Sequence, residues 1–93
     1  MARGEPIPAS DPRRILAANL RRLRDERRLS QEQLAGIAEL NVSDISRIEN
    51  LRREPGLRVM VKLARGLSVP IGELLDGIQT AGSQAHDSRQ PRG

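Results

Sequence analysis

The stretch that decides the fold is residues 30–50, which read SQEQLAGIAELNVSDISRIEN. It opens with a capping box, in which the Ser30 hydroxyl closes a helix N-terminus and the Gln33 side chain reaches back to the backbone. Small and apolar residues then recur at helical spacing and predict the buried side of a short helix. These residues are Leu34, Ala35 and Ala38.

A second helix start follows within a few residues. The segment from Asn41 to Asp44 offers capping side chains, and Ile45 and Ile48 would face inward from the helix behind it. The outward face of that helix then carries Val42, Ser43, Ser46 and Arg47. Two short capped helices joined by a few residues are the pattern of a helix-turn-helix.

Further helices are predicted on both sides of this motif. The first begins with Asp11 as its N-cap and Pro12 at its first position. Pro55 and Gly56 break the chain before a fourth helix, and a fifth starts near Pro70. Their inward residues are Leu16, Leu20 and Leu23, then Met60, Leu63, Ala64 and Leu67, then Ile71, Leu74, Leu75 and Ile78. No strand is predicted, so the fold class is all-α with five helices.

The composition of the 93-residue chain indicates one small helical domain. It contains no aromatic residue, so aliphatic side chains must supply the core, which suits helices better than sheets. We expect the domain over residues 11–78, between a flexible N-terminal arm (1–10) and a disordered C-terminal tail (79–93). Both ends are rich in polar and charged residues with Pro or Gly, and they cannot bury enough apolar surface to fold.

Composition also limits the class of function. With no cysteine and a single histidine, His86 in the tail, we expect no metal site and no cofactor. No apolar run reaches the ~20 residues of a membrane span, and no secretory signal is recognisable, so a cytoplasmic protein is expected. The net charge of +4 fits a phosphate-rich partner. A mildly basic soluble surface would give the same charge, because 12 acidic residues are interspersed among the 16 basic ones.

The order of these motifs resembles the lambda-repressor-like Cro/cI (XRE) family of helix-turn-helix DNA-binding proteins. The resemblance is carried by LSQEQLA at 29–35, ISRIEN at 45–50, RREP at 52–55, KLA at 62–64 and ELL at 73–75. It implies the family's five-helix domain, with a recognition helix from about Val42 to Asn50 in the major groove of double-stranded DNA.

The resemblance also implies which residues bind DNA. They are Ser30, Gln31, Asn41, Val42, Ser43, Ser46, Arg47, Arg52 and Arg53. Gln31 would contact a phosphate at a helix N-terminus, or else be an ordinary exposed residue. Arg47 would fork onto a guanine or contact a phosphate, and Val42 and Ser43 would touch bases or act as spacers. Arg52 and Arg53 would clamp phosphates, unless they form a plain solvated loop.

Other residues have structural explanations. In the family, the residues corresponding to Arg24 and Glu49 form an ion pair between the first helix and the end of the third. A carboxylate at Asp44 is unfavourable beside phosphates, and its explanation is the N3 position of the third helix, where it complements the helix dipole.

Four positions differ from the residues that the family or helix propensity favours, and one of them is Pro70, which replaces a usual serine cap. Glu39 stands where a glycine usually allows a left-handed turn, so strain is expected there. Leu51 replaces another usual glycine, and we expect it to alter the exit from the third helix and to supply a hydrophobic contact. Gly66 lies inside the fourth helix at a cost of about 1 kcal/mol relative to alanine.

The fifth helix offers more apolar residues than one inward stripe needs. In the family the end of this domain commonly forms the two-fold contact, so Leu75 and Ile78 are the candidate dimer interface. The alternative is that Leu75 covers the monomer core and Ile78 frays.

The predicted function is a sequence-specific transcriptional regulator, a repressor or controller, that binds a palindromic operator as a homodimer. One alternative is an antitoxin whose charged ends bind a small protein partner while its domain regulates the operon. Another is an adaptor that keeps the fold without reading DNA. An enzyme is not expected, because the chain has no cysteine, one histidine in the tail and no paired carboxylates suited to a catalytic pocket.

Overall fold

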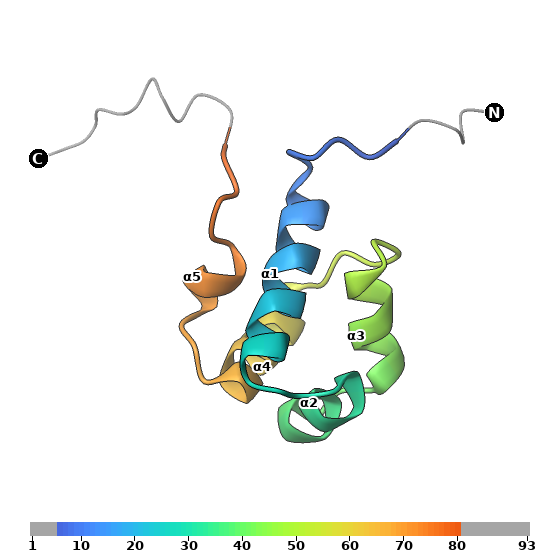
Figure 1. Cartoon of the computed structure of the whole chain (residues 1–93), viewed down its shortest axis with the longest axis vertical. Coiled ribbons are helices and arrows are strands. Elements are labelled where there is room, and N and C mark those ends of the chain that lie inside the picture. Colours follow the sequence, from blue (N-terminus) through green and yellow to red (C-terminus); the bar gives the residue numbers. More distant parts are fainter. Residues whose placement is uncertain (1–5, 81–93) are drawn as a thin grey trace, which may run out of the picture.

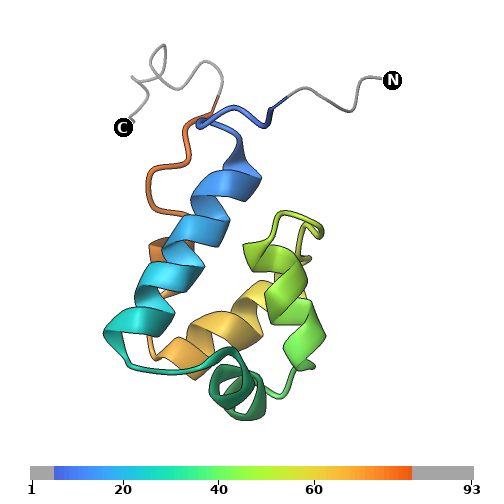
Figure 2. The ribbon, with the colours of Figure 1, turned by 45° about the vertical axis from the view of Figure 1, so that its right-hand side comes forward.

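A computed structural model describes residues 6–80, and over these residues the chain forms helices joined by turns and short loops. The helices are α1 (Pro12–Glu26), α2 (Gln31–Ala38), α3 (Val42–Glu49), α4 (Leu57–Leu67) and α5 (Ile71–Leu74). In Figures 1 and 2, α3 and α5 lie on opposite sides of α1, and α2 lies at the end of the molecule away from both ends of the described chain. The predicted all-α fold with five helices is confirmed over the described residues.

The long helix α1 begins as its sequence predicts. The Asp11 carboxylate accepts a hydrogen bond from the backbone N–H of Arg13 at 2.8 Å, and Pro12 takes the first helical position. Just past the end of the helix, the Arg27 guanidinium donates to the Leu67 carbonyl at 2.6 Å. This contact ties the end of α1 to the end of α4.

The predicted capping box is present at the start of α2. The Ser30 hydroxyl accepts from the backbone N–H of Gln33 at 2.9 Å, and the Gln33 side chain accepts from the N–H of Ser30 at 2.8 Å. After α2, Glu39 adopts the left-handed conformation with φ 60° and ψ 47°, as expected at a position that usually holds glycine. Asn41 is the N-cap of α3, but its side chain makes no capping hydrogen bond, so the expected cap at this position is wrong in that detail.

An aliphatic core joins all the helices. Every inward residue predicted for α1, α2 and α3 is buried, whereas Met60 and Ile71 are only half-buried. The residues with a fully covered side chain include Leu20, Leu34, Ile45, Leu63, Leu67 and Leu74. Each such burial contributes about 1.5–3 kcal/mol, so the core fixes the position of α3 from its inner side.

Gly66 has a packing reason that its sequence position does not reveal. A Cβ atom at this position would lie 3.0 Å from Leu34 Cδ1 and 3.1 Å from Ala38 Cβ. The glycine therefore allows α2 to approach α4 closely, and this packing offsets its cost in helix propensity.

Helix α5 is shorter than predicted. It ends at Leu74, which is buried, while Leu75 is exposed and Ile78 is half-buried beyond the helix. The Asn19 side chain of α1 donates to the carbonyls of Leu74 and Asp76, at 2.8 and 2.9 Å. Because a side chain of α1 supplies the hydrogen bonds to these carbonyls, the chain can leave the helical conformation after Leu74.

Part of the predicted arm and tail is described. At residues 6–10, the Pro8 carbonyl accepts from the backbone N–H of Asp11, and the Ile7 carbonyl accepts from the Arg14 guanidinium at 3.2 Å. Residues 1–5 and 81–93, which include His86, lie outside the described residues.

Candidate DNA-binding surface

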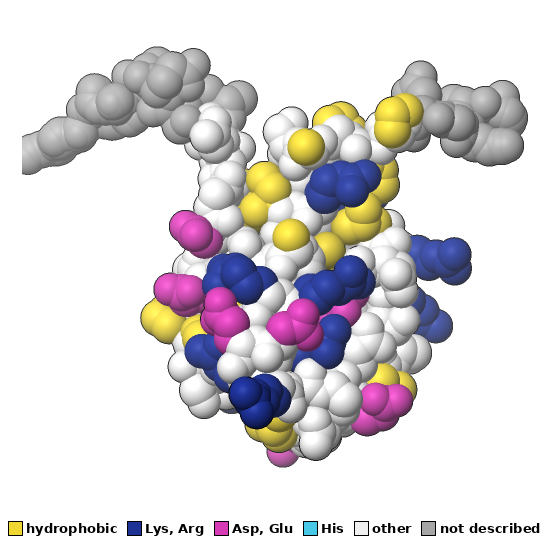
Figure 3. All heavy atoms as spheres, in the orientation of Figure 1, with side chains coloured by type: hydrophobic (Ala, Val, Ile, Leu, Met, Phe, Trp, Pro, Cys, Tyr) yellow, Lys and Arg dark blue, Asp and Glu magenta, His cyan; other side chains and the backbone are white. Residues whose placement is uncertain are grey.

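The segments that carry the predicted DNA-binding residues lie next to one another. Helix α2 packs against α3, and the loop at residues 50–54 directly follows α3. Figure 3 shows positively charged side chains projecting from the edge formed by α3 and this loop, and the basic residues of these two segments are all arginines. We call the exposed side of α3, the N-terminus of α2 and the loop 50–54 the candidate DNA face.

Helix α3 presents a short mixed surface to solvent. Val42 is 39% exposed, Ser43 is exposed, and the Arg47 side chain is 58% exposed. Ser46 is more restricted, because the Asn50 side chain donates to its carbonyl at 2.9 Å and to its hydroxyl at 3.3 Å. The methyl groups of Val42, the hydroxyl of Ser43 and the guanidinium of Arg47 are therefore accessible for contacts in a DNA groove.

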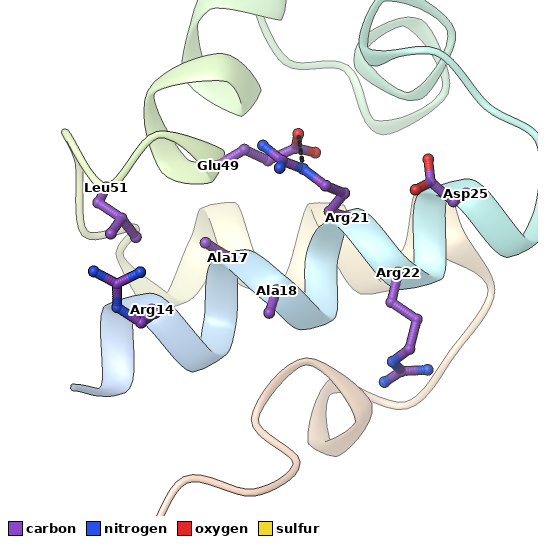
Figure 4. Close-up of a pocket in the computed structure, with 8 residues that line it drawn as sticks. All are labelled: Arg14, Ala17, Ala18, Arg21, Arg22, Asp25, Glu49 and Leu51. Carbon is purple, nitrogen blue, oxygen red and sulfur yellow. Dashed lines mark hydrogen bonds and ion pairs between the residues drawn. The ribbon is translucent and has the colours of Figure 1, made fainter. Parts of the chain in front are cut away.

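The exit from α3 keeps the geometry that a glycine would give. Leu51 has φ +61°, and the backbone N–H of Arg52 donates to the Arg47 carbonyl at 2.7 Å. Our expectation that Leu51 alters this exit is therefore wrong. Leu51 adopts this left-handed conformation, and its side chain lines the same hollow as Ala17 (Figure 4). The expected hydrophobic contact of Leu51 remains a prediction.

The two loop arginines differ in their surroundings. Arg52 is exposed. Arg53 donates to Asp44 Oδ1, and the Arg47 guanidinium lies 4.0 Å from the same oxygen. Asp44 does occupy the N3 position of α3, but its carboxylate also has a loop partner that sequence analysis missed. The Arg53 guanidinium, predicted to clamp a phosphate, is bound to this carboxylate in the free protein.

Glu49, at the end of α3, is the charged centre below this surface. Its side chain is 0% exposed. Arg24 donates to both carboxylate oxygens, from Nε at 2.9 Å and from Nη2 at 3.1 Å, so the two residues of the expected ion pair are bonded in the structure. The Gln31 side chain donates to the same carboxylate at 3.0 Å, and Arg21 Nε lies 3.4 Å away.

The balance of these contacts keeps Glu49 charged. Burial alone would raise the pKa of the Glu49 carboxyl, but hydrogen bonds from Arg24 and Gln31 outweigh it, with help from the nearby arginine charges. The pKa therefore lies below the ordinary value of 4.5. One buried anion thus organises side chains from α1 and α2 around the end of α3.

The side chains of Gln31 and Ser30, both predicted to bind DNA, have partners within the protein. The Gln31 amide is engaged with Glu49, and the Ser30 hydroxyl is engaged in the capping box. The first N–H groups of a helix have no partner within it, so a phosphate at this end would be held by the backbone of α2.

Arg21 of α1 contacts the Glu49 carboxylate and was not among the site residues predicted from the sequence. Figure 4 shows it reaching from α1 to Glu49, while Arg22 points away. Arg21 is 54% exposed and borders a hollow of about 410 Å³ that Arg14 also lines. Its spacing of one turn from Arg24 was the signal that could have placed it beside Glu49.

A helix-turn-helix with an exposed second helix, flanked by a helix N-terminus and a cationic loop, defines a class of DNA-binding domain. The helix-turn-helix family model HTH_3 matches residues 20–74, and this chain belongs to that family. The match extends from the middle of α1 to the end of α5 and confirms the resemblance found in the sequence.

Three known proteins are similar to this chain in sequence or structure. The chain is 38% identical over 65 residues to Control protein C.SmaI of Serratia marcescens, covering 70% of this chain and 77% of that protein. It is 35% identical over 69 residues to the HTH-type transcriptional regulator DdrOP3 of Deinococcus deserti, covering 74% of this chain. The chain spans about half of DdrOP3, 54% of its length. The crystal structure of the restriction-modification controller protein C.AhdI from Aeromonas hydrophila superposes with a TM-score of 0.63 at 35% identity, covering 64% of this chain and 91% of that one.

Within residues 6–80, no group of three or more His, Cys, Asp or Glu side chains is arranged to hold a metal ion. No helix in the same part of the chain has the length and apolar character needed to cross a membrane.

Proposed function

We propose that this protein is a sequence-specific, DNA-binding transcriptional regulator of the controller or repressor kind, acting as a homodimer in the bacterial cytoplasm. The observation that carries the proposal is the placement of α3. Ile45 and Ile48 are buried on its inner side, while Val42, Ser43 and Arg47 are exposed on its outer side. The similarity to a control protein and to a transcriptional regulator supports the same class.

The proposed mechanism divides the contacts by role. Phosphates would meet the N-terminus of α2 and the loop at Arg52, and these contacts would set position and affinity. Base edges would meet α3, where Arg47 can donate to guanine O6 and N7, and Val42 can touch a thymine methyl group. Occupancy of the DNA site would then repress or activate transcription.

Dimerisation would double these contacts and match a palindromic site. Leu75, 37% exposed, and the half-buried Ile78 line a hollow of about 390 Å³. Its other lining residues are the apolar Leu16, Met60, Pro12 and Pro55 and the charged Asp11, Arg13 and Glu54. A second copy of the chain would cover this hollow, and a palindromic site would require the two recognition helices to lie about 34 Å apart, one turn of DNA.

The dimer proposal is tested by Ile78→Lys, compared with Ile37→Lys on α2. Ile37 is 56% exposed on another helix, so its substitution adds the same charge away from the hollow. We expect Ile78→Lys to sediment as a monomer with normal helicity and weakened duplex binding, while Ile37→Lys stays dimeric. If Ile78→Lys remains a dimer and binds as before, the interface lies elsewhere.

DNA binding itself is tested by salt titration. Neutralising about four to six phosphates per dimer predicts a log–log slope between about −4 and −5 for duplex affinity. Arg47→Ala should lower affinity for the preferred site by about 1–3 kcal/mol and relax selection at one base pair in each half-site. A flat response between about 50 and 200 mM salt would contradict the proposal.

A further inference from the structure

Asp44 is an acidic residue on the candidate DNA face, where it would lie close to phosphates. Its side chain is only 17% exposed, because it is covered by arginines from two segments. Arg53 of the loop is bonded to Asp44 Oδ1, and Arg47 of α3 lies 4.0 Å from that oxygen. The N3 position explains a carboxylate at this place, but it does not explain the loop arginine bound to it.

A guanidinium recognises carboxylates and phosphates through the same planar set of donors. Asp44 therefore occupies the part of Arg53 that a DNA phosphate would use. Arg53 is 35% exposed in this arrangement, whereas Arg47 keeps 58% of its side chain surface exposed. The carboxylate thus restrains the loop cation more than the helix cation.

We propose that Asp44 is a positioning residue that holds Arg53 away from DNA phosphates and so lowers the sequence-independent affinity of the candidate DNA face. This inference rests on the proposed function. It gives the acidic residue a purpose: a regulator that binds any duplex tightly is sequestered by the excess of non-specific sites. Base contacts along α3 then contribute a larger share of the total binding.

The size of the effect follows from counterion release. One recovered phosphate contact steepens the log–log salt slope by about 0.9 and raises affinity about eightfold at 0.1 M salt. We therefore expect Asp44→Asn to show both changes for each subunit on a duplex of random sequence.

The test measures fluorescence anisotropy of a labelled random-sequence duplex over a salt series. Glu73→Gln is the charge-matched control, because Glu73 is exposed on α5, on the other side of α1 from α3 (Figure 1). A second comparison introduces Asp44→Asn into an Arg53→Gln background. If the asparagine variant melts below the assay temperature, Asp44→Ser serves in its place.

The expected result is a gain for Asp44→Asn well above that of Glu73→Gln, and a smaller gain when Arg53 is absent. An equal gain in both backgrounds would overturn the proposal, since Asp44 would then act only as a negative charge near DNA. A loss confined to the duplex selected for the wild-type protein would also overturn it, because Asp44 would then read a base. Wild-type protein without salt-sensitive duplex binding would refute the proposed function and this inference with it. Wild-type binding with no gain in Asp44→Asn would refute this inference alone.

Discussion

Substitution of Arg24 by alanine removes the main partner of a buried carboxylate. Arg24 donates two hydrogen bonds to Glu49 and a third, at 2.8 Å, to the carbonyl of Leu29. Its side chain is 14% exposed and that of Glu49 is 0% exposed, so in the folded protein the carboxylate depends on this guanidinium rather than on water for most of its charge compensation. Gln31 and Arg21 still contact the carboxylate, and they limit the damage.

The expected magnitude follows from this arrangement. Removing one partner of a buried ion pair costs about 3–5 kcal/mol. Because Glu49 keeps its two other contacts, we expect the lower end of that range, about 3 kcal/mol. For a domain of this size each kcal/mol lowers Tm by roughly 4–8 °C, so Arg24→Ala should melt about 12–24 °C below the wild-type protein.

The assay is thermal and urea unfolding followed by far-UV circular dichroism at neutral pH. Arg22→Ala is the matched control, because Arg22 lies on the same helix and pairs with Glu26 at 3.3 Å in an exposed i,i+4 arrangement. That pair is worth about 0.3–0.5 kcal/mol. If Arg24→Ala costs no more than Arg22→Ala, the assignment of Glu49 as a buried charged centre is refuted.

Other predictions concern acid stability and two backbone positions. The folded-state pKa of Glu49 lies below 4.5, so its stabilisation is present above that pH and is lost as pH falls through the folded-state value. Urea unfolding across a pH series should therefore show a smaller acid loss in Glu49→Gln than in the wild-type protein, and parallel curves would contradict this. Gly66→Ala should reduce stability by about 1 kcal/mol through overpacking, whereas Gly36→Ala, where a Cβ meets no atom within 4 Å, should raise it by about 0.5–1 kcal/mol. Equal effects of the two substitutions in urea unfolding would rule out the packing explanation. Glu39→Gly should raise the unfolding free energy by about 1 kcal/mol because φ is +60°, and a decrease would argue against strain at this turn.

The helix-turn-helix could be predicted because its determinants are local. The capping box of Ser30 and Gln33 fixes the start of α2, and the spacing of Ile45 and Ile48 fixes the inner face of α3. Signals of this kind depend on a few neighbouring residues, so they can be recognised without knowledge of the tertiary contacts.

Contacts between distant charged side chains could not be predicted in the same way. The chain has 16 basic residues, and in sequence the solvated ones look the same as those with partners. Arg21 meets Glu49 only when α3 is docked on α1, and Arg53 meets Asp44 only when the loop after α3 folds back along that helix. The family resemblance indicated the partner of Arg24 but not the partners of these two arginines. For Arg21 the available signal was its spacing of one helical turn from Arg24, and for Arg53 there was none.

The length of α5 was missed for a related reason. Apolar residues at helical spacing continue to Ile78, which favoured a longer helix. The helix ends at Leu74 in a region where Asn19, 55 residues earlier in the chain, binds the carbonyls. The spacing of apolar residues alone cannot predict hydrogen bonds from a side chain on another helix.

The most direct test of the central claim is selection of bound duplexes from a random pool, followed by sequencing. A homodimeric regulator of this class should select a two-fold symmetric consensus whose half-sites are centred about 10 base pairs apart, one turn of DNA. A pool that shows no enriched sequence after repeated selection, although the protein remains folded, would contradict it.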